Sequence, residues 1–210
     1  MSTIYKQIEQ YQLMPVVKLE RVEDAVPLAQ ALCDGGLACA EITFRTAVAV
    51  EAIAAITKAF PHMLIGAGTI LTTEQADAAI AAGAAFLVSP GLNPDVVSYC
   101  QSKGYPILPG VCTPSEIEKA LAMGLTYLKF FPAEAAGGTA MLKALSAPYA
   151  MVRWMPTGGV SLQNLRSYLD LPSVFACGGS WMVADKWIKA GDFVTITKLT
   201  AEAAALRITE

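Results

Sequence analysis

The chain has 210 residues, of which 54% are apolar and only 16% are charged, and its formal net charge is −3. An average soluble chain carries roughly 25% charged residues, so much of this sequence is expected to be buried, and intrinsic disorder is excluded. The slightly acidic balance and the lack of a basic run exclude the phosphate-neutralising surface that nucleic-acid binding requires.

The composition also argues against a membrane span, a secretory leader and a metal site. The longest apolar stretch, Ala78 to Val88, is shorter than the roughly 20 residues that cross a bilayer. Met1 to Leu13 contain no continuous apolar segment of the signal-peptide type. Five cysteines without a Cys-x-x-Cys pair and a single histidine argue against a disulfide framework or a zinc site. We therefore expect a cytoplasmic protein that uses no cofactor and does not bind nucleic acid or a membrane.

Short β-like runs alternate with helix-length segments along the whole chain. The predicted strands are, in order, Pro15 to Leu19, Ala38 to Thr43, Met63 to Ala67, Ala85 to Ser89, Pro106 to Gly110, Thr126 to Phe131, Val152 to Pro156 and Val174 to Cys177. The segments between them carry one apolar stripe each, which is typical of helices that cover a sheet. Ile4 to Gln12 precede the first strand and are predicted to form an extra N-terminal helix across the bottom of the fold.

Eight alternating units with continuous apolar strands predict an α/β protein with a parallel sheet covered by helices. The number of units favours a closed (β/α)8 barrel, the TIM barrel, which begins at roughly 200 residues. A doubly wound open sheet is the alternative. We expect one domain over residues 1–210, because the sequence contains no linker or low-complexity segment.

The unusual residues fall at the carboxyl ends of the predicted strands, where a barrel of this kind builds its site. In chain order the motifs are Glu41-Ile42-Thr43-Phe44-Arg45-Thr46, Gly66-Ala67-Gly68-Thr69, Ser89-Pro90-Gly91, Pro109-Gly110, Lys129-Phe130-Phe131-Pro132-Ala133-Glu134, Pro156-Thr157-Gly158-Gly159 and Gly178-Gly179-Ser180-Trp181. Glu41, Thr43 and Arg45 are expected on one side if the backbone stays extended. A simple ion pair between Glu41 and Arg45 is the alternative to a catalytic role.

Lys129 is a charged residue inside an apolar strand. Strand alternation places Tyr127, Lys129 and Phe131 on one face. An amine held among aromatic side chains loses hydration, which favours the neutral form that attacks a carbonyl to make a Schiff base. The alternatives are an interior lysine paired with a carboxylate and a solvated lysine on an edge strand.

Two glycine pairs, Gly158-Gly159 and Gly178-Gly179, close the last two strands, and Ser180 follows the second pair. Glycine lets backbone N–H groups approach a phosphate, and a helix that starts there adds partial positive charge. Ordinary turns are the alternative. The segment Gly66 to Thr69 lacks the third glycine of a dinucleotide loop, and Cys112 and Cys177 lack a histidine base, so both of those readings are rejected.

As a set and in this order, the motifs resemble the bacterial 2-keto-3-deoxy-6-phosphogluconate (KDPG) aldolases of the Entner-Doudoroff pathway, which often also cleave 4-hydroxy-2-oxoglutarate (KHG). The resemblance spans nearly the whole chain. It implies a class I aldolase, a carbon-carbon lyase of carbohydrate metabolism that yields pyruvate and glyceraldehyde 3-phosphate without a metal. It also implies a homotrimer of complete barrels.

The resemblance also implies a role for each site residue. Lys129 would be the Schiff-base lysine and Glu41 the proton-transfer residue, while Arg45 and Thr69 would bind the carboxylate of the pyruvate half. The remaining residues would hold the phosphate (Gly158, Gly159, Gly179 and Ser180) or wall the pocket (Pro90 and Phe131).

Other functions compete with this one. A phosphosugar epimerase or decarboxylase would need paired acid and base groups, and only Glu41 is conspicuous. A non-catalytic phosphosugar-binding barrel and an aldolase for the galactonate-derived epimer remain as alternatives, because stereochemistry at C4 is not legible from the sequence.

Overall fold

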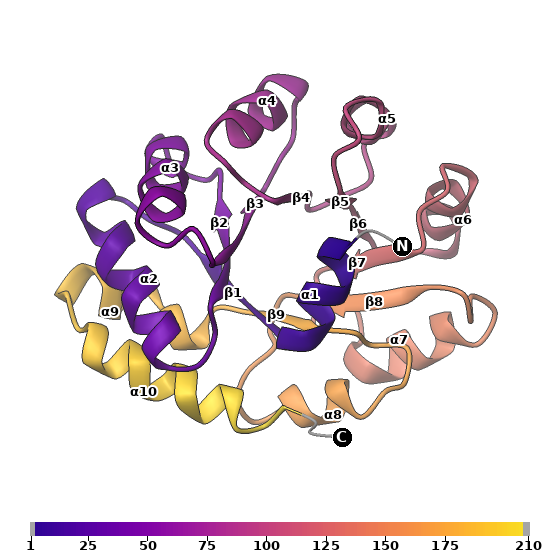
Figure 1. Cartoon of the computed structure of the whole chain (residues 1–210). Helices are drawn as coiled ribbons and strands as arrows, with labels where there is room; N and C mark the ends of the chain where they lie inside the picture. The colour runs from indigo at the N-terminus through magenta and orange to yellow at the C-terminus, as the bar shows by residue number, and fades with distance from the viewer. Residues whose placement is uncertain (1–2, 208–210) are drawn as a thin grey trace.

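The computed structural model describes residues 3–207, in which parallel strands alternate with helices (Figure 1). The strands are β1 (Leu13–Val17), β2 (Cys39–Thr43), β3 (Leu64–Gly68), β4 (Phe86–Val88), β5 (Ile107–Leu108), β6 (Gly110–Val111), β7 (Tyr127–Phe130), β8 (Arg153–Pro156) and β9 (Cys177–Gly179). The α-helices are α1 (Thr3–Tyr11), α2 (Ala25–Asp34), α3 (Ala49–Ala59), α4 (Thr73–Ala81), α5 (Pro94–Ser102), α6 (Pro114–Ala122), α7 (Gly138–Ser146), α8 (Leu165–Leu169), α9 (Asp185–Ala190) and α10 (Phe193–Ala204). Two short 3-10 turns, η1 (Val22–Asp24) and η2 (Trp181–Val183), complete the described elements.

The strands form two parallel sheets. One has the order β5-β4-β3-β2-β1-β9 and the other the order β6-β7-β8. Two isolated parallel bridges, Trp154 with Val174 and Thr157 with Gly178, connect β8 with the segment of β9. The predicted alternation of parallel strands and helices is therefore confirmed.

The predicted strand from Pro106 to Gly110 is divided in two. Pro109 separates β5, which belongs to the six-stranded sheet, from β6, which belongs to the three-stranded one. Proline has no amide hydrogen to donate to a neighbouring strand. The hydrogen bonds change partner at this point, because Leu108 O accepts from Ser89 N whereas Pro109 O accepts from Lys129 N.

The first and last strands differ most from their predicted boundaries. β1 begins at Leu13, before Pro15, and β9 begins at Cys177, where the last predicted strand ended. The β9 segment continues through glycines, which strands disfavour. Packing explains their presence here, because a Cβ built on Gly178 would lie 2.3 Å from Thr157 Oγ1.

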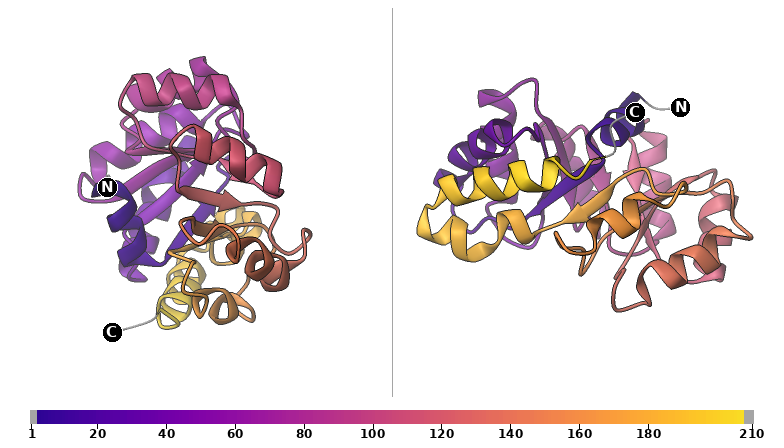
Figure 2. Two further views of the ribbon diagram at one scale, coloured as in Figure 1. Left: turned by 90° about the vertical axis from the view of Figure 1, so that its right-hand side faces the viewer. Right: turned by 90° about the horizontal axis from the view of Figure 1, so that it is seen from below.

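Helices cover the outer side of the strands, and α1 alone lies in front of them (Figure 1). The last helix, α10, packs beside α2, so the two ends of the alternating pattern meet (Figure 2). Coverage by helices explains why strand side chains on both faces are buried, as Leu128, Lys129 and Phe130 are in β7. Among residues 3–207, no helix combines the length and apolar character needed to cross a membrane.

Capping residues determine where three of the helices begin. At α6, Thr113 Oγ1 accepts from the Glu116 N–H while the Glu116 carboxylate accepts from the Thr113 N–H, and Pro114 takes the first helical position. Such a capping box satisfies two amide groups that would otherwise lack a partner, and its loss costs about 1 kcal/mol. Thr72 and Asn93 cap α4 and α5 in a similar way.

The predicted N-terminal helix is present as α1 and packs across the amino ends of the strands. The ring of Tyr5 stacks on Tyr127, the first residue of β7, with 4.5 Å between centroids. The Tyr5 hydroxyl donates to Ile107 O in β5 at 3.2 Å. Burial is the main cause that raises the pKa of Tyr5 to about 12, so its hydroxyl stays a donor. Together with the fully buried Ile8, these contacts cover the end of the fold that lies opposite the carboxyl ends of the strands.

Candidate active site

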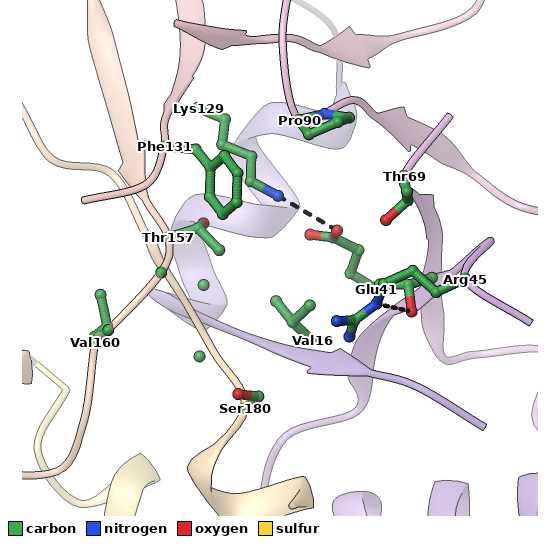
Figure 3. Close-up of a pocket in the computed structure, with 15 residues that line it drawn as sticks. Val16, Glu41, Arg45, Thr69, Pro90, Lys129, Phe131, Thr157, Val160 and Ser180 are labelled. Atoms are coloured by element: carbon green, nitrogen blue, oxygen red, sulfur yellow. Dashed lines mark hydrogen bonds and ion pairs between the residues drawn. The ribbon is translucent and has the colours of Figure 1, made fainter. Parts of the chain in front are cut away.

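A cavity of about 300 Å³ opens at the carboxyl ends of the strands (Figure 3). Its lining includes all ten residues that the sequence analysis assigned to the site: Glu41, Arg45, Thr69, Pro90, Lys129, Phe131, Gly158, Gly159, Gly179 and Ser180. The lining also includes five residues that were not assigned: Val16, Thr43, Thr157, Val160 and Gly178. The structure thus brings residues from distant motifs into one space.

Lys129 and Glu41 face each other inside this cavity. Lys129 Nζ in β7 lies 3.5 Å from Glu41 Oε1 in β2 (Figure 3), and the two residues are only 5% and 1% exposed. Burying either charge alone would cost several kcal/mol, and the opposite charge of the partner offsets this cost. The predicted alternative of an interior lysine paired with a carboxylate is therefore present in the structure. The edge-strand alternative is wrong, because β7 lies between β6 and β8.

The aromatic surroundings of Lys129 differ from the prediction. Phe131 lies beside it, with Nζ 5.2 Å from the ring centroid, a distance at which a cation and an aromatic face attract. Tyr127 instead stacks on Tyr5 at the amino end of the strands and does not line the cavity. Strand alternation correctly places both rings on one face, but two residues along a strand are far enough apart to separate the site from the covered end.

The position of Glu41 depends on a glycine in the neighbouring strand. A Cβ on Gly68 would lie 2.0 Å from Glu41 Oε1, so a side chain there would displace the carboxylate. The other oxygen, Oε2, is buried and has no hydrogen-bond partner among the described residues. An unsatisfied buried acceptor costs roughly 1–3 kcal/mol, which favours a water or a substrate hydroxyl at this point.

Arg45 lines the cavity although the backbone turns after β2. Its Nε donates to Thr43 Oγ1 at 3.1 Å, and Thr43 in turn donates to Val17 O at 2.8 Å. No ion pair joins Arg45 to Glu41 among residues 3–207, so the predicted alternative of a simple pair between them is wrong. The guanidinium is held through Nε, and its two terminal nitrogens can contact a ligand.

Thr69 adopts a backbone conformation that β-branched residues rarely adopt. Its φ angle is 61°, in the left-handed region, directly after β3. Such strain costs on the order of 1–3 kcal/mol and is concentrated at functional sites. No sequence signal could have indicated this conformation, because threonine does not favour it.

The glycine pairs lie across the cavity from these residues. Thr157, Val160 and Ser180 are on one side in Figure 3, and Glu41, Thr69 and Arg45 are on the other. Gly158 and Gly159 have φ angles of 99° and 82°, which only glycine adopts readily. We call Thr157–Val160 the β8 loop.

The helix starts predicted to support the glycine pairs are not where they were expected. The helix after the β8 loop, α8, begins only at Leu165 and has 5 residues, and Ser180 is followed by the three-residue turn η2. The sequence signal was misread because a glycine pair fixes a turn and does not define where the next helix begins. An anion on this side would be bound by backbone N–H groups and the Ser180 hydroxyl with little help from helix ends.

The described residues offer no group of three or more His, Cys, Asp or Glu side chains placed to hold a metal ion. The thiol of Cys112 lies outside the cavity lining, and burial followed by the Glu116 charge raises its pKa, which disfavours the nucleophilic thiolate. The arrangement provides one buried amine, one buried carboxylate, one arginine and an array of N–H donors. Such a set can form an imine, move a proton and hold two anionic groups.

Comparison with known proteins identifies the family. The family model described as KDPG and KHG aldolase matches residues 4–199. The 2-dehydro-3-deoxy-phosphogluconate aldolase of Treponema pallidum is 56% identical over 202 residues, which cover 96% of this chain and 96% of that protein.

Solved structures agree with the sequence comparison. The KDPG aldolase of Legionella pneumophila, captured with pyruvate as a covalent carbinolamine intermediate, superimposes with a TM-score of 0.93 at 40% identity, covering 96% of this chain and 98% of that one. The 2-keto-3-deoxy-6-phosphogluconate aldolase of Zymomonas mobilis with 3-phosphoglycerate has a TM-score of 0.92 at 40% identity, covering 99% and 97% of the two chains.

Proposed function

The chain belongs to the KDPG and KHG aldolase family, and from this premise we propose how it works as a class I aldolase. It cleaves KDPG to pyruvate and glyceraldehyde 3-phosphate, and KHG to pyruvate and glyoxylate, in the carbohydrate metabolism of the Entner-Doudoroff pathway. The observation that carries the proposal is the buried Lys129 that faces Glu41 at 3.5 Å inside the cavity.

The reaction begins with the formation of the imine. Transfer of a proton from Lys129 to Glu41 leaves a neutral amine, which attacks the C2 ketone of the substrate. The protonated Glu41 then gives its proton to the carbinolamine hydroxyl, which leaves as water, so an iminium ion joined to Nζ remains and Glu41 is again a carboxylate. This cation is the electron sink that metal-dependent aldolases obtain from a divalent ion.

Cleavage and release follow from the same two residues. Glu41, directly or through a water at its unpartnered Oε2, takes the proton of the C4 hydroxyl. The C3–C4 bond breaks, its electron pair moves into the iminium to give an enamine, and the aldehyde leaves. Protonation of the enamine at C3 and attack by water then release pyruvate and restore Lys129.

The rest of the cavity binds the two ends of the substrate. Arg45 and Thr69 hold the carboxylate next to C2, because a guanidinium can make two parallel charge-assisted bonds to a carboxylate. Pro90 and Phe131 form the walls. Gly158, Gly159, Gly179 and Ser180 hold the phosphate on the opposite side of the cavity.

We extend the proposal to the architecture: the two sheets form one closed (β/α)8 barrel in a single domain with α1 as an extra helix. The bridges between β8 and the β9 segment support closure on one side. The continuous segment that contributes β5 to one sheet and β6 to the other supports it on the opposite side. The two ends of the chain, residues 1–2 and 208–210, lie outside the described residues.

Family membership is also the basis on which we propose a homotrimer in the cytoplasm. The five cysteines all have free thiols in the described structure, which agrees with a reducing compartment. Small molecules are the partners that the site requires.

Pyruvate release tests the proposed function directly. Purified protein is expected to cleave KDPG faster than the galactonate-derived C4 epimer, and KHG more slowly than KDPG, because only the phosphorylated substrates use the glycine-rich side. A lactate dehydrogenase assay with NADH measures pyruvate in all three cases. Faster cleavage of the epimer would favour the epimer-specific aldolase, and no cleavage of any substrate would favour the non-catalytic binding protein.

Ser180→Ala tests the phosphate side. Loss of one hydrogen bond to an anion costs roughly 1.5–3 kcal/mol, so kcat/KM for KDPG should fall about 10- to 150-fold. Cleavage of KHG, which has no phosphate, should change much less. Ser102→Ala is the matched control, because Ser102 is exposed on α5 and its hydroxyl donates to Tyr99 O, outside the cavity lining. Equal losses on KDPG and KHG would contradict the phosphate role.

A further inference from the structure

The β8 loop is held from behind by three hydrogen bonds to successive carbonyl groups. Thr157 O accepts from Ala133 N at 2.8 Å and Gly158 O from Glu134 N at 3.0 Å. Gly159 O accepts from the side-chain Nδ2 of Asn164 at 3.1 Å. In a trans peptide the N–H points opposite to the carbonyl of the same plane. The N–H groups of the next three residues, at positions 158, 159 and 160, therefore point away from these donors.

Those three N–H groups are available to a ligand. No protein group within residues 3–207 accepts a hydrogen bond from Gly158 N, Gly159 N or Val160 N. The three residues also line the cavity. Backbone N–H groups are strong donors, and three neighbouring donors without a protein acceptor on one wall match the oxygens of a phosphate.

Asn164 differs from the other two donors because it acts through a side chain. Its Nδ2 binds Gly159 O while its Oδ1 accepts from Ser161 N at 2.7 Å, so one amide group holds the loop on both sides of Val160. Asn164 is half-buried and does not line the cavity. Its only route to a ligand is through the backbone that it holds.

The β8 loop packs closely on Glu134. A Cβ on Gly159 would lie 2.6 Å from Glu134 Cβ, so the loop rests directly on that side chain. Glu134 Oε1 in turn accepts a hydrogen bond from the Tyr168 hydroxyl, and Tyr168 is fully buried. Burial and then the contact with Glu134 raise the pKa of Tyr168, which keeps its hydroxyl a donor.

We propose that Asn164 is a positioning residue that selects phosphorylated substrates by fixing the peptide between Gly159 and Val160 with its N–H toward the cavity. This inference rests on the proposed function, because it assigns the phosphate half of KDPG to the β8 loop. The role requires Asn164 Nδ2 as the donor to Gly159 O. The Oδ1 atom of the same amide separately accepts from Ser161 N.

Asn164→Ala tests this role by steady-state kinetics on two substrates. KM for KDPG is expected to rise roughly 5- to 50-fold with little change in kcat, because one N–H bond to an anion is weakened before chemistry begins. Kinetic constants for KHG should stay within about twofold. Equal losses on both substrates would show a general structural role and overturn the proposal.

Two further variants keep the test decisive. Asn164→Asp preserves the shape and the acceptor for Ser161 N but removes the donor to Gly159 O, so it should lose KDPG selectivity and still fold. Wild-type selectivity in this variant would overturn the need for the donor. Asn93→Ala is the matched control, because Asn93 caps α5 away from the cavity with its Oδ1 on Asp95 N.

A binding measurement separates this proposal from the catalytic one. Glycerol 3-phosphate, an unreactive phosphate probe, should raise the melting temperature of the unmodified protein and of Asn93→Ala, but much less that of Asn164→Ala. Failure of the catalytic proposal with retention of this pattern would leave the role of Asn164 intact. Equal stabilisation of Asn164→Ala and the unmodified protein would overturn it.

Discussion

Incubation with pyruvate and sodium borohydride is expected to attach one permanent adduct, at Lys129 and at no other lysine. Borohydride reduces an imine to a stable secondary amine, so only a lysine that forms the imine gains mass. Lys129 is the one lysine in the cavity lining, where Arg45 can hold the pyruvate carboxylate next to it. Intact-mass measurement followed by peptide mapping checks both the number and the position of the adducts.

Lys129→Arg should retain the fold and lose cleavage. Arginine keeps a positive charge opposite Glu41 but stays protonated and cannot form an imine. Removing the nucleophile of a catalytic unit has cost on the order of 10⁶ in kcat in a well-studied protease, and we expect a loss of several orders of magnitude here. Lys143→Arg, on α7 and away from this cavity, is the control. An adduct on another lysine, or substantial cleavage by Lys129→Arg, would refute the assignment.

Glu41→Gln is expected to slow turnover by roughly 10² to 10⁴, the usual value of positioned proton transfer. Glutamine matches the shape of the carboxylate that fits against Gly68, so the loss would reflect proton transfer and not misfit. Trapping of pyruvate on Lys129 should still occur, although more slowly, because water can accept the ammonium proton that Glu41 takes in the unmodified enzyme. Single-turnover cleavage of KDPG and borohydride trapping measure the two steps separately.

The control for this variant is Glu118→Gln, because Glu118 is exposed on α6 and accepts a hydrogen bond from the Tyr149 hydroxyl away from the cavity. It should behave like the unmodified enzyme. Turnover near the wild-type rate in Glu41→Gln would mean that another group moves the proton.

The sequence was most informative where one pattern determines one structural property. Alternation within an apolar strand placed Lys129 and Phe131 on one face, and the rule that barrel sites form at carboxyl ends brought Glu41 and Arg45 to the same end. The order of parallel strands and helices followed from the same periodicity. These features follow from patterns within single segments, which can be recognised without knowing which other segments pack against them.

Features set by contacts between distant segments were missed. Val16 looks like any core valine, and although Thr43 and Thr157 belong to the predicted motifs, neither threonine was assigned to the site whose cavity it lines. The left-handed Thr69 opposes its own local preference. The β9 strand runs through glycines that packing explains, because a Cβ on Gly178 would meet Thr157 and one on Gly179 would meet Trp181. Sequence patterns report the preferences of single residues, whereas the cavity lining and these backbone conformations depend on the side chains of neighbouring segments.

The placement of Glu41 on β2 and Lys129 on β7 has a consequence for how the protein folds. The two residues are far apart in the sequence, and β3, β4 and the β5–β6 segment separate their strands around the sheets. Bringing their side chains to 3.5 Å therefore closes a long segment of chain, which costs conformational entropy. Docking of the intervening strands and helices offsets this cost. We therefore expect activity during refolding to recover only after the strands and helices between β2 and β7 have formed.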